Sequence, residues 1–242
     1  MAAMRRAALL AFACLAAAGD AEVRLPVASE ATKPADGAAL IHLNAEGLVV
    51  VDKDGKPAAL SLDQLKGWLR ERKRPEVTVR ADEKAPWLHV QRIVEICADA
   101  RTGLGVKGAG GEEGWLELPA GRADAGAAKV VVRIVVTKEE AAVWGPTQAA
   151  VALPVEITYR MADIEAKEID AVRRYIRDAA QTAAASDDAV VGEIRAGPKV
   201  PFAVVVAVLN EYHRAGLKDV RFEPAAPASP EERRAPRLSY PK

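Results

Sequence analysis

The hydrophobic residues of this chain fall into two successive series of strands and helices. In each series, short β-branched and aliphatic runs predict a hairpin, and apolar residues three and four positions apart predict two amphipathic helices around a further strand. The first series predicts strands at residues 39–43, 48–51 and 76–81, and helices at residues 61–73 and 86–101. The second series predicts strands at residues 129–136, 141–144 and 189–196, and helices at residues 163–181 and from residue 201 to the glycine at 216.

Local signals mark the ends of several elements. Ser61 and Gln64 have the spacing of a capping box, and Asp163 can cap the long helix of the second series. Gly103 and Gly105 are expected to end the helix that begins at residue 86. The remaining assignments are a strand break at residues 52–57, edge or closing strands at residues 115–118 and 220–222, and an inserted strand at residues 153–161.

One stretch of the chain occurs twice. Residues 80–90 and 195–205 each contain the end of a strand, a turn with a lysine and a proline, and the start of an amphipathic helix. Matching positions lie 115 residues apart without a gap, which favours a duplicated unit. The matched pairs are Arg80 and Arg195, Lys84 and Lys199, Pro86 and Pro201, Trp87 and Phe202, Val90 and Val205, Ile93 and Val208, and Val94 and Leu209.

The repeated motif resembles the periplasmic domain of the ExbD/TolR family. The resemblance is carried by residues 77–82, by the pair Pro86 and Trp87, and by the segments 25–26 and 55–65. In the second copy the arginine, alanine, proline and aromatic residue of the motif are kept. The resemblance therefore extends, more loosely, to the second half of the chain.

The resemblance implies an α+β fold of two tandem units, each a small mixed β-sheet with two helices packed on one face. It covers residues 23–107 closely and residues 129–223 more loosely, where Gly197 stands in the place of Asp82. The predicted division is a signal peptide or short N-terminal anchor at 1–21, a tether at 22–38, a first ExbD/TolR-like domain at 39–118, a linker at 119–128, a second such domain at 129–223 and a disordered tail at 224–242.

The family assignment implies a non-catalytic envelope protein of systems that use proton-motive force for biopolymer transport or envelope maintenance. Its partners would be inner-membrane motor subunits or envelope proteins, and peptidoglycan in the TolR branch. Family members carry a proton-conducting aspartate in a transmembrane helix, but residues 1–19 contain no acidic residue, so no position inherits that role. Because family domains dimerise, two copies in one chain predict an internal pseudo-dimer, with a homodimer of chains as the alternative.

The N-terminal residues predict export to the periplasm. Arg5 and Arg6 precede an apolar run at residues 7–18, and small residues suited to cleavage follow. The run is shorter than the roughly 20 apolar residues that span a bilayer. We therefore interpret residues 1–21 as an export signal; retention as a short membrane anchor and lipidation at Cys14 are the alternatives.

Composition and charge narrow the range of partners. The chain has 34 basic and 34 acidic residues, so its net charge gives no reason to expect nucleic acid as a partner. After removal of the signal, Cys97 is the one remaining cysteine, on the apolar side of a predicted helix, where a structural role is expected.

The sequence predicts no catalytic residue, no cofactor and no metal site. His42, His89 and His213 are scattered, without the spacing of metal ligands. The adjacent carboxylates at 139–140 and 187–188 lie in predicted turns, where neighbouring side chains point apart. The first hypothesis is therefore the envelope protein, and the second is an exported peptidoglycan-binding module without motor function. An exported enzyme is the third hypothesis.

Within the repeated motif, the prolines and aromatic residues are expected to determine the fold. The charged positions remain as a candidate partner-binding surface. They are Arg80, Asp82, Lys84, Arg195 and Lys199.

Overall fold

The computed structural model describes most of the chain. The described residues are 23–33, 37–53, 56–72, 76–118, 130–139, 142–143, 151–152, 156–186 and 189–224. The predicted export signal at 1–21, the linker at 119–128 and all of the predicted tail except Pro224 lie outside these residues. Most of the two predicted domains lies within them.

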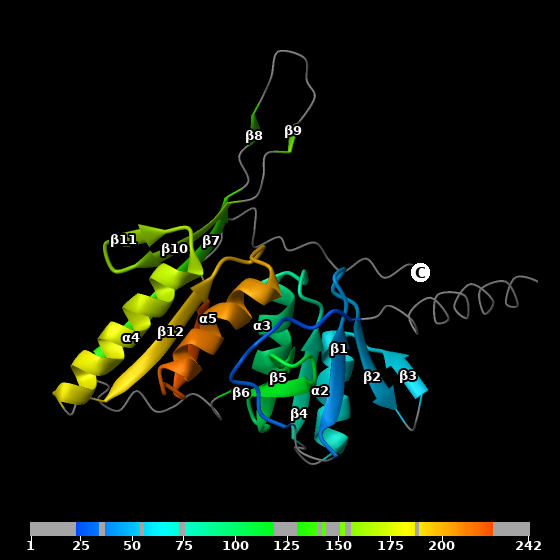
Figure 1. Cartoon of the computed structure of the whole chain (residues 1–242). Helices are drawn as coiled ribbons and strands as arrows, with labels where there is room; N and C mark the ends of the chain where they lie inside the picture. Colours follow the sequence, from blue (N-terminus) through cyan, green and yellow to red (C-terminus); the bar gives the residue numbers. More distant parts are fainter. Residues whose placement is uncertain are drawn as a thin grey trace, which may run out of the picture.

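The first half forms a mixed six-stranded sheet with the order β3-β2-β1-β4-β5-β6 (Figure 1). Strands β1, β4 and β5 are parallel, and β2, β3 and β6 are antiparallel to their neighbours. The strands are β1 (Ala39–Leu43), β2 (Val49–Lys53), β3 (Lys56–Ala59), β4 (Val77–Ala81), β5 (Thr102–Lys107) and β6 (Glu113–Glu117).

Two helices connect the parallel strands of this sheet. Helix α2 (Leu62–Glu71) connects β1 and its hairpin partners to β4, and α3 (Trp87–Ile96) connects β4 to β5. Both crossovers step across the sheet in the same direction, and parallel crossovers are right-handed, so both helices lie on one face. The predicted capping box of α2 is confirmed, because the Ser61 hydroxyl accepts a hydrogen bond from the Gln64 amide and the Gln64 side chain accepts one from the Ser61 amide.

The second half forms a five-stranded sheet with the order β11-β10-β7-β12-β13. Here β7, β12 and β13 are parallel, while β10 and β11 are antiparallel. Helices α4 (Ile169–Ala185) and α5 (Phe202–Arg214) connect the parallel strands. The strands are β7 (Val130–Glu139), β10 (Glu156–Met161), β11 (Ile164–Ala166), β12 (Val190–Ala196) and β13 (Val220–Pro224).

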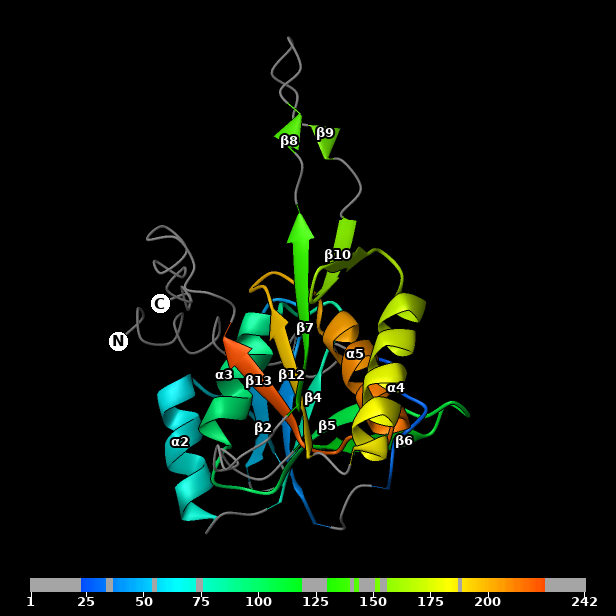
Figure 2. The ribbon, with the colours of Figure 1, turned by 90° about the vertical axis from the view of Figure 1, so that its left-hand side faces the viewer.

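The described part of the chain is therefore an α+β protein with two mixed sheets and four helices, as the sequence predicted at this level. The two sheets have matching strand orders, except that β6 has no counterpart beside β13. Helices α2 and α3 lie on one side of the molecule, and α4 and α5 on the other (Figure 2). Small and β-branched residues, with Trp87, Phe202 and Tyr212, fill the core between the sheets and helices.

Two assignments in the first half were wrong. The predicted break at residues 52–57 contains the start of β3, where Pro57 lies in an edge strand that tolerates its missing N–H. The predicted helix 86–101 ends at Ile96, and Gly103 and Gly105 belong to β5. Gly103 is required there because a Cβ atom would lie 1.0 Å from Trp115 Nε1.

Three assignments in the second half were also wrong. Strand β7 pairs with β10, so the segment taken for an insertion occupies the sheet position of β2, while β8 (Ala142–Val143) pairs with β9 (Val151–Ala152) in a separate ribbon. Asp163 caps no helix: with Ala162 it forms the two-residue turn between β10 and β11, and α4 begins only at Ile169.

The segment expected to be a tether at 22–38 is packed onto the fold over residues 23–33. Ala28 is buried, and its N–H donates to the Lys107 carbonyl. Thr32 and Trp115 exchange two backbone hydrogen bonds, which extends the sheet beyond β6. The sequence showed no apolar period here because an irregular segment needs only isolated buried residues to be held in place.

Candidate interaction site

The two copies of the repeated motif are bonded directly to each other. Trp87 N–H donates to the Val200 carbonyl and Phe202 N–H donates to the Ala85 carbonyl, both at 2.8 Å. A second matched pair joins Leu88 N–H to the Pro198 carbonyl at 3.2 Å and Ala203 N–H to the Glu83 carbonyl at 3.0 Å. Each bond has its counterpart 115 residues away, so residues 83–88 and 198–203, here named the seam, have the reciprocity of a two-fold interface.

The seam also completes the N-termini of helices α3 and α5. The first N–H groups of a helix have no partner within the helix and are normally capped by a side chain. Pro86 and Pro201 occupy the cap positions and offer no side-chain hydrogen bond. The carbonyls of the other copy serve instead, so each half of the molecule caps a helix of the other half.

Apolar contacts reinforce the seam. Trp87 and Phe202, which begin the two helices, are fully buried. The Trp87 ring lies 5.0 Å from the ring of Phe222 in β13, measured between centroids. An aromatic side chain of the first half is thus packed against a strand of the second.

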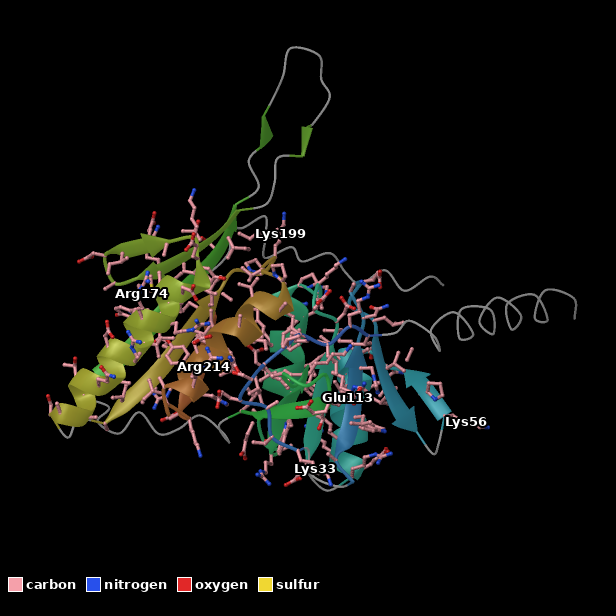
Figure 3. All side chains as sticks on the ribbon, in the orientation of Figure 1. Lys33, Lys56, Glu113, Arg174, Lys199 and Arg214 are labelled. Atoms are coloured by element: carbon pink, nitrogen blue, oxygen red, sulfur yellow. The ribbon has the colours of Figure 1, made fainter. Side chains whose placement is uncertain are left out.

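Three of the predicted surface residues lie in or next to the turns of the seam. The Asp82 carboxylate accepts hydrogen bonds from the amides of Arg24 and Lys84, so it holds a turn and the N-terminal segment, and it is not free for a partner. Lys84 and Lys199 are exposed. Figure 3 shows Lys199 near the end of the molecule from which β8 and β9 project.

Arg80 lies elsewhere, on the face of the first sheet that the helices leave open. In β4, Val77, Val79 and Ala81 are buried in the core, so Thr78 and Arg80 point to the opposite face. A groove with a volume of about 270 Å³ lies over these two residues. Its lining residues are Leu25, Lys33, Gly37, Ala38, Leu40, Thr78, Arg80, Gly105, Glu113 and Gly114.

The Arg80 side chain crosses the sheet to form an ion pair with Glu113. It passes over Gly105, where a Cβ atom would lie 2.8 Å from Arg80 Cγ. Two polar atoms of the groove lining, Arg80 Nε and Thr78 Oγ1, are among the buried atoms of the described residues that have no hydrogen-bond partner. Polar atoms buried in this way are uncommon in folded proteins.

Arg195, the counterpart of Arg80, is in a different environment. Its Nε donates to the Glu193 carboxylate at 2.6 Å, and Arg133 Nε donates to the same oxygen at 2.5 Å. Burial would raise the pKa of Glu193, but hydrogen bonds from the two arginines outweigh it and hold the pKa below its usual value. Arg195 is therefore occupied within the second sheet and is not a free surface cation.

The N-terminal segment joins the two halves at a further place. Glu30 N–H donates to Asn210 Oδ1 at 3.0 Å, and Arg214 Nη2 donates to the Ser29 hydroxyl at 2.7 Å. Arg214 also contacts Glu211, which is paired with Arg173 of α4. No signal in the sequence pointed to these polar contacts, because they depend on how the segment crosses α5.

The histidines and the cysteine are dispersed. Burial lowers the pKa of His42, His89 and His213, and it raises the pKa of the Cys97 thiol to about 12. Within the described residues, no three His, Cys, Asp or Glu side chains are placed to hold a metal ion. The same residues include no helix of the length and apolar character needed to cross a membrane.

The chain was compared with family models, curated proteins and solved structures. None of them matches. The seam and the groove are the two features of the described residues that bear on function.

Proposed function

We propose that this protein is a non-catalytic envelope protein of ExbD/TolR type, exported to the periplasm, which works by protein–protein contact. The observation that carries the proposal is the reciprocal seam between its two copies of the motif. In the family that the motif resembles, the periplasmic domains dimerise. A chain with two copies, each capping a helix of the other, supplies both halves of such a pair.

The geometry of the seam favours a permanent pairing. Each of the four backbone hydrogen bonds of the seam contributes about 0.5–1.5 kcal/mol to holding the halves together. Trp87 and Phe202 would also lose their burial if the halves separated. One chain therefore suffices to form the paired unit, and no second chain is needed to complete the seam.

The mass of the purified protein in solution tests this proposal. Light scattering coupled to size exclusion should give the mass of one chain, 25.7 kDa before any cleavage. A tight homodimer in which the two units of each chain are apart would contradict the internal pairing. N-terminal sequencing of protein from the envelope fraction would test export, for which a start near residue 19 or 22 is expected.

The proposed contact surface is tested by charge reversal. Lys84 and Lys199 are exposed within the seam, so the double change to glutamate should weaken capture of purified inner-membrane motor subunits without unfolding the protein. Lys56, exposed on β3 and far from Lys199 (Figure 3), is the matched control position. Unchanged capture by the double variant would refute this surface.

The alternative function, an exported peptidoglycan-binding module without motor function, makes a different prediction. Such a protein would sediment with intact sacculi in the absence of any protein partner. The envelope-contact function predicts retention only when the motor subunits are present. Absence of binding in both experiments would favour the third hypothesis, an exported enzyme.

A further inference from the structure

The groove over the open face of the first sheet is a site that the seam does not use. We propose that it binds a carboxylate group of a ligand about the size of one amino acid residue, with Arg80 as the principal cation. This proposal does not rest on the proposed function. It would stand whether or not the paired unit contacts motor subunits.

The second sheet displays the interaction that the first sheet lacks. Thr78 and Glu193 are matched positions on β4 and β12, each two residues before the arginine of the motif. In the second sheet the Glu193 carboxylate accepts a hydrogen bond from Arg195 Nε at 2.6 Å. In the first sheet the short Thr78 side chain takes that position, and Arg80 Nε has no partner there.

The groove thus has a donor for a carboxylate but has no carboxylate at the position that Glu193 occupies in the second sheet. Arg80 Nε is buried and unpartnered, and the hydroxyl of Thr78, a residue that is only 4% exposed, is buried and unpartnered beside it. A carboxylate from outside that displaced the atoms covering Arg80 Nε would accept from it as Glu193 accepts from Arg195. It would also accept from the Thr78 hydroxyl, which satisfies both buried groups.

The charges of the lining favour one negative charge. Lys33 and Arg80 contribute two cations, and Glu113, paired with Arg80, contributes one anion. A singly charged carboxylate would bring the lining to neutrality. A dianion such as a phosphate would leave an excess negative charge next to Glu113, so it is disfavoured.

The shape of the groove limits the ligand to a small group. Three glycines and an alanine in the lining leave its volume of about 270 Å³, just below the usual range for binding pockets. Leu25 and Leu40 supply apolar contacts, and Leu40 is 38% exposed although it is large and aliphatic. These features suit a carboxylate carried on a short apolar side chain.

The corresponding face of the second sheet has a different lining. Gly103 and Gly105 of β5 have Arg221 and Glu223 as their counterparts on β13, since Thr78 is paired with Gly103 and Glu193 with Arg221. Charged side chains therefore stand at the positions that these glycines occupy in the first sheet. Arg195 is for this reason the matched control for Arg80.

The test is titration of the full chain with N-acetylalanine, with N-acetylalanine amide, and with short peptides that end in a free carboxylate or an amide. Binding is followed by calorimetry and by NMR shifts of β4 and β5. Both free acids should bind, and their amides should bind at least about tenfold more weakly, since a hydrogen bond to a charged group is worth about 1.5–3 kcal/mol. Binding of only the peptides would assign the site to a peptide C-terminus, and binding of only N-acetylalanine to a small acid.

Three variants decide whether Arg80 carries the binding. Arg80→Gln should reduce the affinity at least about tenfold, whereas Arg195→Gln should leave it unchanged. Thr78→Glu should abolish binding, because it places in the first sheet the carboxylate that Glu193 provides in the second. Circular dichroism checks that each variant is folded.

The proposal is overturned by any of three results. These are equal binding of acids and amides, equal loss in the Arg80 and Arg195 variants, and no binding of any probe at millimolar concentration. The mass measurement reports on the seam and the titration reports on the groove. Failure of one is thus distinguished from failure of the other.

Discussion

The open faces of the two sheets differ although their strands have matching order. On the second sheet, Glu193 lies between Arg133 and Arg195, and all three side chains are paired. On the first sheet, the position of Glu193 is occupied by Thr78, and Arg80 reaches over a glycine to an exposed carboxylate. In the second copy of the motif, the arginine is therefore paired with a carboxylate of its own strand. In the first copy, the arginine lines a groove.

The two halves share the seam and differ on their open faces. The seam residues are similar in both copies because each copy completes the other. The open faces make no such reciprocal contact, so threonine and glycines in one copy correspond to glutamate and charged residues in the other. The two halves share the structural role of the seam, whereas the groove of about 270 Å³ lies over the first sheet.

The largest expected effect comes from the seam. Trp87→Ala removes a fully buried side chain that contacts Phe222, and the free energy of unfolding should fall by about 3–5 kcal/mol. Its counterpart, Phe202→Ala, should have an effect of similar size. Because the halves cap each other, thermal unfolding should remain a single transition in both variants, as measured by calorimetry. Two separate transitions would mean that the halves are independent.

A smaller effect is expected from filling the glycine positions of the first sheet. In Gly103→Ala the new Cβ atom would coincide with the Trp115 ring, which must move, so the stability should fall by about 1–3 kcal/mol. Gly67→Ala is the control, because no atom lies within 4 Å of its Cβ position in helix α2. That change should stabilise the protein by up to about 1 kcal/mol. Urea unfolding of both variants measures the difference.

The two open faces can be compared directly through their carboxylates. Glu193→Gln leaves Arg133 and Arg195 without their anion at a site where the glutamate side chain is 12% exposed, so a loss of about 1–3 kcal/mol is expected. Glu113→Gln affects an exposed pair and should cost at most about 1 kcal/mol. Equal losses in chemical denaturation would contradict the distinction between a satisfied network and an open groove.

The smallest effect is expected from pH. Burial lowers the pKa of His42, His89 and His213 in the folded state, so the unfolded chain binds more protons once the pH falls below about 6.5. The stabilising contribution of the neutral histidines is therefore fully present above about pH 6.5. It decreases as the pH falls toward the lower pKa values that these histidines have in the folded state. Unfolding measured between pH 7 and pH 5 should show this decrease, and His213→Gln should make it shallower. A pH-independent stability would contradict the prediction.

Much of the fold could be predicted from the sequence because local signals and burial agreed. The capping box at Ser61, the alternation in β4 and β12, and the apolar stripes of α3 and α5 are each readable within a dozen residues. Strand β5 was missed because its glycines are typical of a loop. Their presence in a strand is explained only by the side chains that lie over them, Trp115 over Gly103 and Arg80 over Gly105. The partner of β7 was missed because the nearest apolar run in sequence forms a different pair.

The candidate site was predicted only in part for a related reason. The sequence singled out Arg80 and Arg195 but gave them the same role, since both stand at the same place in the motif. Part of their difference is local, since Thr78 precedes one arginine by two residues and Glu193 the other. The rest arises from strands distant in sequence, which bring Glu113 and Gly105 to Arg80 and Arg133 to Glu193. Charge alone does not indicate whether an arginine is already paired.

The sequence by itself determined most of the elements and the repetition of the motif, because periodicity, capping and the 115-residue spacing are local or directly countable. Only the tertiary structure decided that the two copies cap each other's helices and that one copy retains unpaired polar groups in a groove. Hydrogen bonds between distant segments depend on where the chain returns in space. That position is set by the packing of the whole molecule.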